Sequence, residues 1–124
     1  MTVHLSSIRT FLAALILATT TVAIGPAPSY AAKSDCPSNR FCVWTEADYS
    51  GQMQSFSATN SYLNITISTV RSYYNRRSYR SWLHEESNGS GSYSCIGPGS
   101  AASSVSTAWK RAAEAVYLAT VTAC

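Results

Sequence analysis

Histidine and acidic residues are scarce in this chain of 124 residues, which has two His and six Asp or Glu. One histidine, His4, falls in an N-terminal segment that we expect to be removed, so that His84 remains alone. The sequence has no nucleophile elbow, no His-Glu-x-x-His and no glycine-rich phosphate loop. General acid–base catalysis needs titratable groups placed together. The sequence therefore predicts a protein that is not an enzyme.

A metal centre lacks its ligands as well. There is no Cys-x-x-Cys pair, and a single histidine cannot complete a zinc site. We expect no metal and no cofactor.

No hydrophobic run is long enough to span a bilayer comfortably. Residues 11–24 are apolar, follow the basic residues His4 and Arg9, and precede small residues at 29–31. This pattern is typical of a secretory signal peptide, with cleavage expected after Ala31. The sequence thus predicts an exported protein without a membrane anchor, in which residues 32–124 form a single domain.

Net charge is small. Without Arg9, the eight remaining basic residues exceed the six acidic ones by two, which is too little to indicate nucleic-acid binding. Half of these basic residues crowd into ten positions among tyrosines and a tryptophan. The cluster can be the solvated side of a strand–turn–strand, or a patch that binds an anionic or polysaccharide surface. Its members are Arg71, Arg76, Arg77 and Arg80.

The four cysteines form an even set in an oxidising compartment, which predicts two disulfides. Three pairings exist. Loop entropy gives about 2.4 kcal/mol for a Cys36–Cys42 ring and about 3.6 kcal/mol for a Cys95–Cys124 loop, but crossed pairings would score higher, so entropy does not select among them. Proximity and the turn at Pro37 favour Cys36–Cys42, which leaves Cys95–Cys124.

Residues up to about 105 are rich in Tyr, Ser, Thr and Val, which favours strands. Glycine, asparagine and serine separate the segments. Apolar residues at helical spacing predict a short helix over 107–114, with Thr107 as a possible cap. The predicted strands are 41–45, 52–57, 70–75, 80–85, 92–96 and 115–121.

A degenerate internal repeat is visible. Trp44, Tyr49 and Gly51 form an aromatic-x4-aromatic-x-Gly pattern, and Trp82 and Gly89 repeat its ends 38 residues later, with a serine in place of the second aromatic. A glycine in such a hairpin can adopt a positive φ and leave room for an aromatic ring. Two such copies predict a small two-sheet sandwich.

At these residues, and at the Cys-Pro-x4-Cys segment that precedes them, the chain resembles the βγ-crystallin-like proteins. More narrowly, it resembles the small secreted actinobacterial metalloproteinase inhibitors of that fold. The resemblance implies an all-β sandwich of two Greek keys. It also implies a monomer that blocks extracellular thermolysin-like zinc proteases.

The resemblance further implies a reactive bond between a half-cystine and a β-branched residue, which here is Cys95-Ile96, in a loop that continues through Gly97 and Pro98. The family closes this loop with a cysteine where this chain has Ser100, so the turn would be more open. Crystallin-type calcium positions, at 67–72 and 109–114, lack the oxygen ligands that calcium needs.

Two other functions fit the same sequence. The arginine and tyrosine cluster could make the chain a secreted binding or toxin-like module directed at microbial cell-wall polymers. A structural protein of a spore surface or coat is also compatible with the composition.

Overall fold

The computed structural model describes residues 32–124, so the predicted signal peptide, residues 1–31, lies outside the described residues. Within residues 32–124, a short 3-10 helix (η1) and a four-residue helix (α1) accompany eight strands. The bounds are η1 Lys33–Asp35, β1 Phe41–Glu46, β2 Ser50–Phe56, β3 Tyr62–Asn64, β4 Ser72–Asn75, β5 Ser81–His84, β6 Tyr93–Ile96, β7 Ala101–Ala102, α1 Ala108–Arg111 and β8 Ala115–Leu118.

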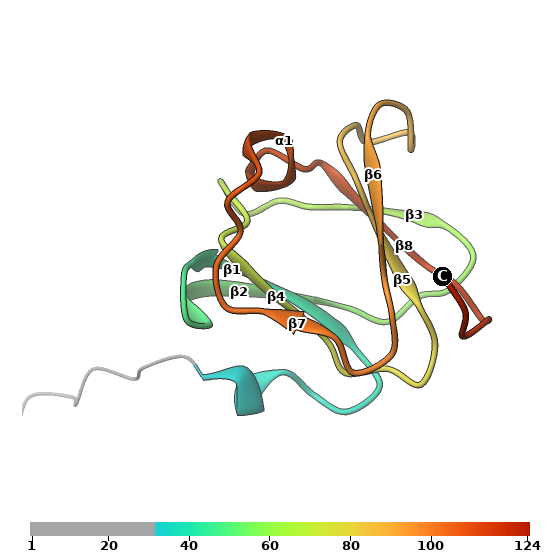
Figure 1. Ribbon diagram of the computed structural model, residues 1–124, viewed down its shortest axis with the longest axis horizontal. Helices are drawn as coiled ribbons and strands as arrows, with labels where there is room; N and C mark the ends of the chain where they lie inside the picture. Colours follow the sequence, from blue (N-terminus) through green and yellow to red (C-terminus); the bar gives the residue numbers. More distant parts are fainter. Residues whose placement is uncertain (1–31) are drawn as a thin grey trace, which may run out of the picture.

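The strands form two four-stranded antiparallel sheets, ordered β2-β1-β4-β7 and β3-β8-β5-β6. The first four strands and the last four are the two halves of the sandwich. Each half places its first, second and fourth strands in one sheet and its third strand in the other. Figure 1 shows β3 beside β8 and β7 beside β4, where these exchanged strands complete the opposite sheet. This arrangement confirms the expected all-β sandwich of two Greek keys.

The core lies between the sheets because alternate residues of each strand point inward. Phe41 and Val43 of β1 and Leu83 of β5 are completely buried there. The outward residues of β1, Cys42 and Trp44, are also buried, because the N-terminal segment that contains Cys36 lies over them. One sheet is therefore covered on both faces.

Both predicted disulfides, Cys36–Cys42 and Cys95–Cys124, are confirmed. Among residues 32–124, no group of three or more His, Cys, Asp or Glu side chains could hold a metal ion. No helix in the same range has the length and apolar character needed to cross a membrane.

Several predicted element bounds were wrong. The short strands β3 and β7 were missed, because two or three residues carry too little alternation to be recognised. The last strand ends at Leu118 rather than at residue 121. The helix is one turn long, and Thr107 stands at its N-cap without a side-chain hydrogen bond.

Candidate functional site: the turn after β6 and the outer faces of the sheets

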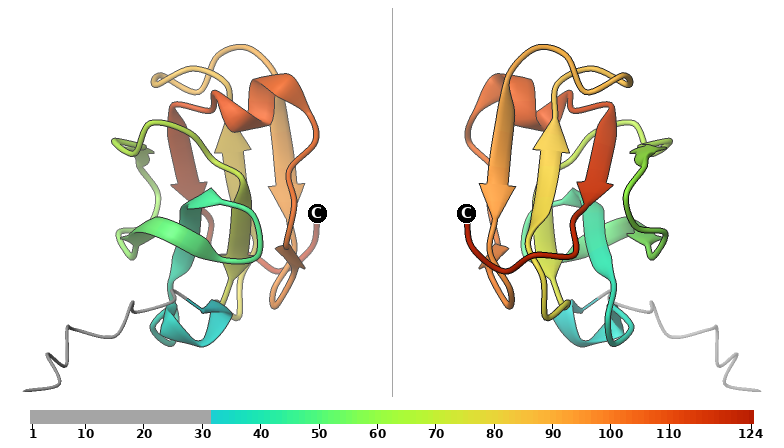
Figure 2. Two further views of the ribbon diagram at one scale, coloured as in Figure 1. Left: turned by 90° about the vertical axis from the view of Figure 1, so that its left-hand side faces the viewer. Right: turned by 90° about the vertical axis from the view of Figure 1, so that its right-hand side faces the viewer.

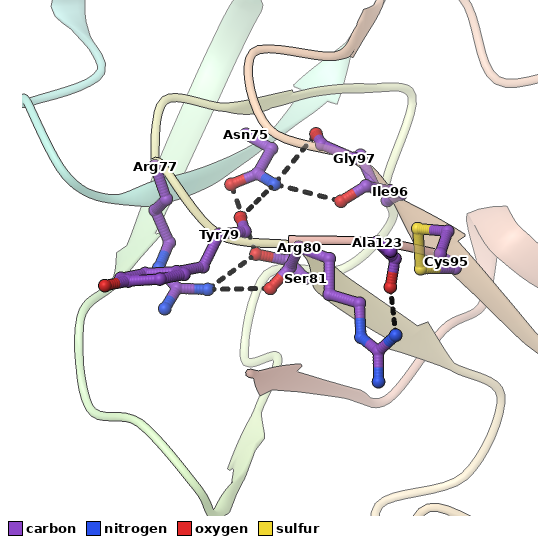
Figure 3. The surroundings of a disulfide bond; sticks show 10 residues. Asn75, Arg77, Tyr79, Arg80, Ser81, Cys95, Ile96, Gly97 and Ala123 are labelled. Atoms are coloured by element: carbon purple, nitrogen blue, oxygen red, sulfur yellow. Dashed lines mark hydrogen bonds between the residues drawn. A yellow bond between two sulfur atoms is a disulfide. The ribbon is translucent and has the colours of Figure 1, made fainter. Parts of the chain in front are cut away.

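The turn at residues 97–100 follows β6 and is held by one buried side chain. The Asn75 amide nitrogen Nδ2 donates to the carbonyl oxygens of Ile96 and Gly97 and to that of Tyr79, each at 2.9 Å. The Asn75 backbone bonds the far side of the turn, receiving the Gly99 N–H and donating to the Ser100 carbonyl. Figure 3 shows the Asn75 amide beside the Ile96 and Gly97 carbonyls, at the start of the turn. Asn75 thus holds both sides of the turn, and its backbone bonds Ser100, the position at which the resemblance implies a second cysteine.

Ile96 does not point out of this turn. Its side chain is 3% exposed and packs in the core between the sheets. The last residue of β6 pairs with Ser81, and that register directs it inward. This burial does not fit a role for Ile96 as the side chain presented to a protease at the Cys95-Ile96 bond. The exposed part of the segment is 98–100, with Gly97 half-buried.

The C-terminal tail is fixed beside the same turn. Cys95 is bonded to Cys124. Arg80 donates its backbone N–H to Val121 and its guanidinium to the Ala123 carbonyl. These bonds tie residues 119–124, which have no regular secondary structure, to the end of β5.

The predicted hairpin motif of the first half is present. Tyr49 packs edge-on against Trp44, with ring centroids 5.3 Å apart. Gly51 has φ +76°, and a Cβ there would overlap Thr45. The Ser72 hydroxyl donates to Glu46 and accepts the Tyr49 N–H, which fixes the hairpin onto β4.

In the second half, the predicted register of the motif was displaced by two residues. The first residue of β1, Phe41, pairs with Phe56, and the first residue of β5, Ser81, pairs with Ile96. Equivalent positions of the two halves are therefore 40 residues apart in the sequence. Trp82 therefore occupies the place of Cys42 rather than that of Trp44, and Gly89 occupies the place of Tyr49. The glycine that corresponds to Gly51 is Gly91, with φ +73°.

His84 and Tyr62 supply the aromatic pair of the second half. Their centroids are 5.1 Å apart at 81°, nearly the geometry of the Trp44–Tyr49 pair. Tyr62 comes from the exchanged strand β3 and fills the space over Gly89, where an added Cβ would overlap its ring. An aromatic ring from the other half has thus replaced the one that residue 89 does not carry.

Replacing Gly89 with Ala should lower the free energy of unfolding by about 3 kcal/mol, since φ is +84° and Tyr62 must move. In a Tyr62→Ala background the further loss should fall to about 1 kcal/mol, the backbone cost alone. Denaturant unfolding of the two single variants and the double variant measures this coupling. Gly99→Ala is the matched control, because Gly99 has φ +71° and open space around it. Equal losses in both backgrounds would contradict the role of Tyr62.

The four arginines do not form one patch. Arg77 is buried and donates to the carbonyls of Arg80 and Ala119 and to the Ser81 hydroxyl. Burial lowers its pKa, and the nearby Tyr79 acts in the opposite direction. Arg77 therefore has a structural role and does not contribute to a shared binding patch, which was one of the two interpretations of the cluster.

The other three arginines are dispersed. Arg71 is exposed just before β4, and Arg76 follows the other end of that strand. The Arg76 guanidinium donates to the Cys36 carbonyl, in the segment that covers the first sheet. Arg80 lies over the Trp82 ring, on the outer face of the second sheet.

That outer face carries an aromatic cluster, which we define as Tyr62, Trp82, His84, Tyr93 and Tyr117. These residues, together with Arg80, line a hollow of about 350 Å³. Sequence reasoning placed Trp82 in the hairpin motif and missed the cluster. The members of the cluster come from four strands. Aromatic residues at alternate positions, such as Trp82 and His84 on β5, are the sequence pattern that could have indicated it.

His84 lies at the base of this hollow and is 7% exposed. Burial lowers its pKa, and a backbone hydrogen bond with Gly89 acts in the opposite direction. The net effect of these surroundings disfavours the charged imidazolium. Its Nδ1 atom has no hydrogen-bond partner among residues 32–124.

Comparison with known proteins identifies the family. The model of peptidase inhibitor family I36 matches residues 29–96, which is more than half of the chain. The chain belongs to peptidase inhibitor family I36. The match ends at Ile96, so the turn at 97–100 and everything after it lie beyond the matched segment.

A structural comparison supports the fold. A solved structure described as "Evolution of the eye lens beta-gamma-crystallin domain fold" is similar to this member of the inhibitor family, with a TM-score of 0.56. The similarity covers 72% of this chain and 92% of that chain at 10% sequence identity, so it establishes the βγ-crystallin-like fold alone. No curated protein sequence matches the chain.

Proposed function

We propose that the protein is a secreted, monomeric inhibitor of extracellular thermolysin-like zinc proteases and that it binds them through the turn at residues 97–100. Membership of the peptidase inhibitor family carries the first part of this proposal. The resemblance of residues 36–51 to metalloproteinase inhibitors favours a zinc protease as the target. Two disulfides suit an extracellular location.

The turn has the properties that a protease-binding segment needs. Residues 98–100 are exposed, and the peptide on either side is held by Asn75. The Ile96 side chain anchors one end in the core, and the Cys95–Cys124 bond lies next to it. A segment ordered before binding loses little conformational entropy in the complex. Ile96 thus acts as the anchor of the turn rather than as the residue inserted into the protease.

Titration of a thermolysin-like zinc protease with the oxidised protein, residues 32–124, tests the proposal. Stoichiometric inhibition by the parent protein is expected. Pro98→Arg should raise the inhibition constant by about tenfold or more, because a long charged side chain at the exposed turn disrupts a fitted contact.

Ser87→Arg is the matched control, because it adds the same side chain at an exposed site in the β5–β6 connection. The register of β5 and β6 places that connection at the opposite end of the sheet from the turn, as Figure 2 shows. The control should inhibit like the parent. Equal inhibition constants for the two variants would remove the turn from the contact, and no inhibition by the folded parent would overturn the choice of target.

A further inference from the structure

The two sheets differ in what covers their outer faces. On the first sheet, the segment that contains Cys36 lies over Cys42 and Trp44 and buries both. The register places Trp82 and His84 at the equivalent positions of the second sheet. No segment among residues 32–124 covers them in that way, and the hollow of about 350 Å³ lies there instead.

The aromatic cluster forms a continuous surface around this hollow. Tyr93 is 61% exposed and Tyr62 is 48% exposed. The Trp82 and Tyr93 ring centroids are 5.1 Å apart, and those of Tyr62 and Tyr117 are 5.2 Å apart. Each of these rings joins an apolar face to a polar group that can hydrogen-bond. A pyranose ring has the complementary form, with C–H groups on its faces and hydroxyls around its rim.

Two polar atoms of the lining lack partners. The Nε atom of Arg80 and the Nδ1 atom of His84 are both buried, and neither has a hydrogen-bond partner among residues 32–124. A buried polar atom without a partner is costly, and a shift of the Arg80 or His84 side chain that exposes this atom to a ligand in the hollow would relieve the cost. The lining contains the cationic Arg80 and no acidic residue. The charge of the hollow therefore favours an anionic group.

We infer that the outer face of the second sheet binds a polysaccharide of carboxylate-bearing pyranoses. A sugar ring packs against the exposed Tyr93 ring and the part of Trp82 that Arg80 leaves open, and its carboxylate accepts a hydrogen bond from Arg80. A hydroxyl of the same sugar bonds His84. This site is separate from the turn proposed to bind proteases. It uses Arg80 and Trp82, which belong to the arginine and aromatic segment seen in the sequence, together with rings from other strands.

Isothermal titration of the oxidised protein with trigalacturonate tests the inference, and the carboxyl-reduced neutral trisaccharide is the matched ligand. The parent should bind the charged form more tightly. Tyr93→Ala and Trp82→Ala should each weaken binding by about fivefold to tenfold, through loss of a stacking ring. Arg80→Gln should remove the preference for the charged form.

Tyr79→Ala is the control, because Tyr79 is an exposed tyrosine outside the hollow. It should bind like the parent. Because Tyr93 is largely exposed, its substitution leaves the fold intact, and circular dichroism verifies this. Amidase-stripped bacterial glycan strands, which carry lactyl carboxylates, form a second arm. Binding to either carboxylated glycan supports the inference and distinguishes a uronic acid polymer from a cell-wall source.

Three results would overturn the inference. The first is the absence of binding to both carboxylated glycans. The second is an equal loss of glycan affinity in Tyr79→Ala and Tyr93→Ala. The third is loss of protease inhibition in the Trp82 and Tyr93 variants while their glycan binding is unchanged. The last result would assign the face to the protease contact. Because inhibition is measured separately on the same proteins, failure of the glycan site and failure of the proposed function remain distinguishable.

Discussion

Replacing Asn75 with Asp is expected to lower the free energy of unfolding by about 3–5 kcal/mol at pH 7. The substitution removes the donors to the Tyr79, Ile96 and Gly97 carbonyls and places a buried carboxylate against three oxygens. Burial raises the pKa of the introduced carboxyl, so the folded state binds more protons than the unfolded state. The loss should therefore diminish as the pH falls from 7 to 4.

Chemical denaturation of the parent and the variant at both pH values measures this effect. Asn64→Asp is the matched control, because Asn64 is exposed on β3 and the change in charge is the same. The control should change stability by less than about 0.5 kcal/mol. A similar small loss for Asn75→Asp would mean that the turn is held by the disulfide and the core alone. The same variant should also inhibit more weakly, because its turn is no longer ordered before binding.

Removing the Cys95–Cys124 bond by replacing both cysteines with alanine should lower the free energy of unfolding by about 3.6 kcal/mol, through the 30-residue loop that it closes. For a domain of this size, the midpoint of thermal unfolding should fall by roughly 15–25 °C. Differential scanning calorimetry measures the shift.

The double alanine variant at Cys36 and Cys42 is the comparison. Its loop is short, and the entropic loss is about 2.4 kcal/mol, but both cysteines are completely buried against Trp44. A smaller loss at Cys95–Cys124 than at Cys36–Cys42 would show that packing outweighs loop closure. It would also show that the bonds from Arg77 and Arg80 hold the tail without the disulfide.

The sequence was sufficient for the fold because its signals are local. Strand-forming residue types in 41–45 and 92–96, paired cysteines and the first hairpin glycine each depend on residues close together in the chain. The sequence did not reveal the role of a residue when that role depends on contact with a distant segment of the chain. Tyr62 lies over Gly89, and Asn75 holds residues 96–100, yet neither residue stands out from its own neighbours.

The same reason explains the errors at the sites. Arg77 and Ile96 have the residue types of a binding patch and a reactive loop, but burial gives both of them structural roles. The strand register decides whether a side chain points outward or inward. A shift of one residue moves every side chain of the strand to the opposite face of the sheet. The aromatic cluster became visible only once the strands that carry it were placed side by side.

The exchange of third strands makes each half dependent on the other. Without β7 the first sheet loses an edge strand, and without β3 the second loses both an edge strand and the ring over Gly89. Neither half can keep its sheet intact while its counterpart melts, so unfolding should be all-or-none. For a member of a peptidase inhibitor family, this cooperativity is protective, because partly unfolded forms are the ones that proteases cleave.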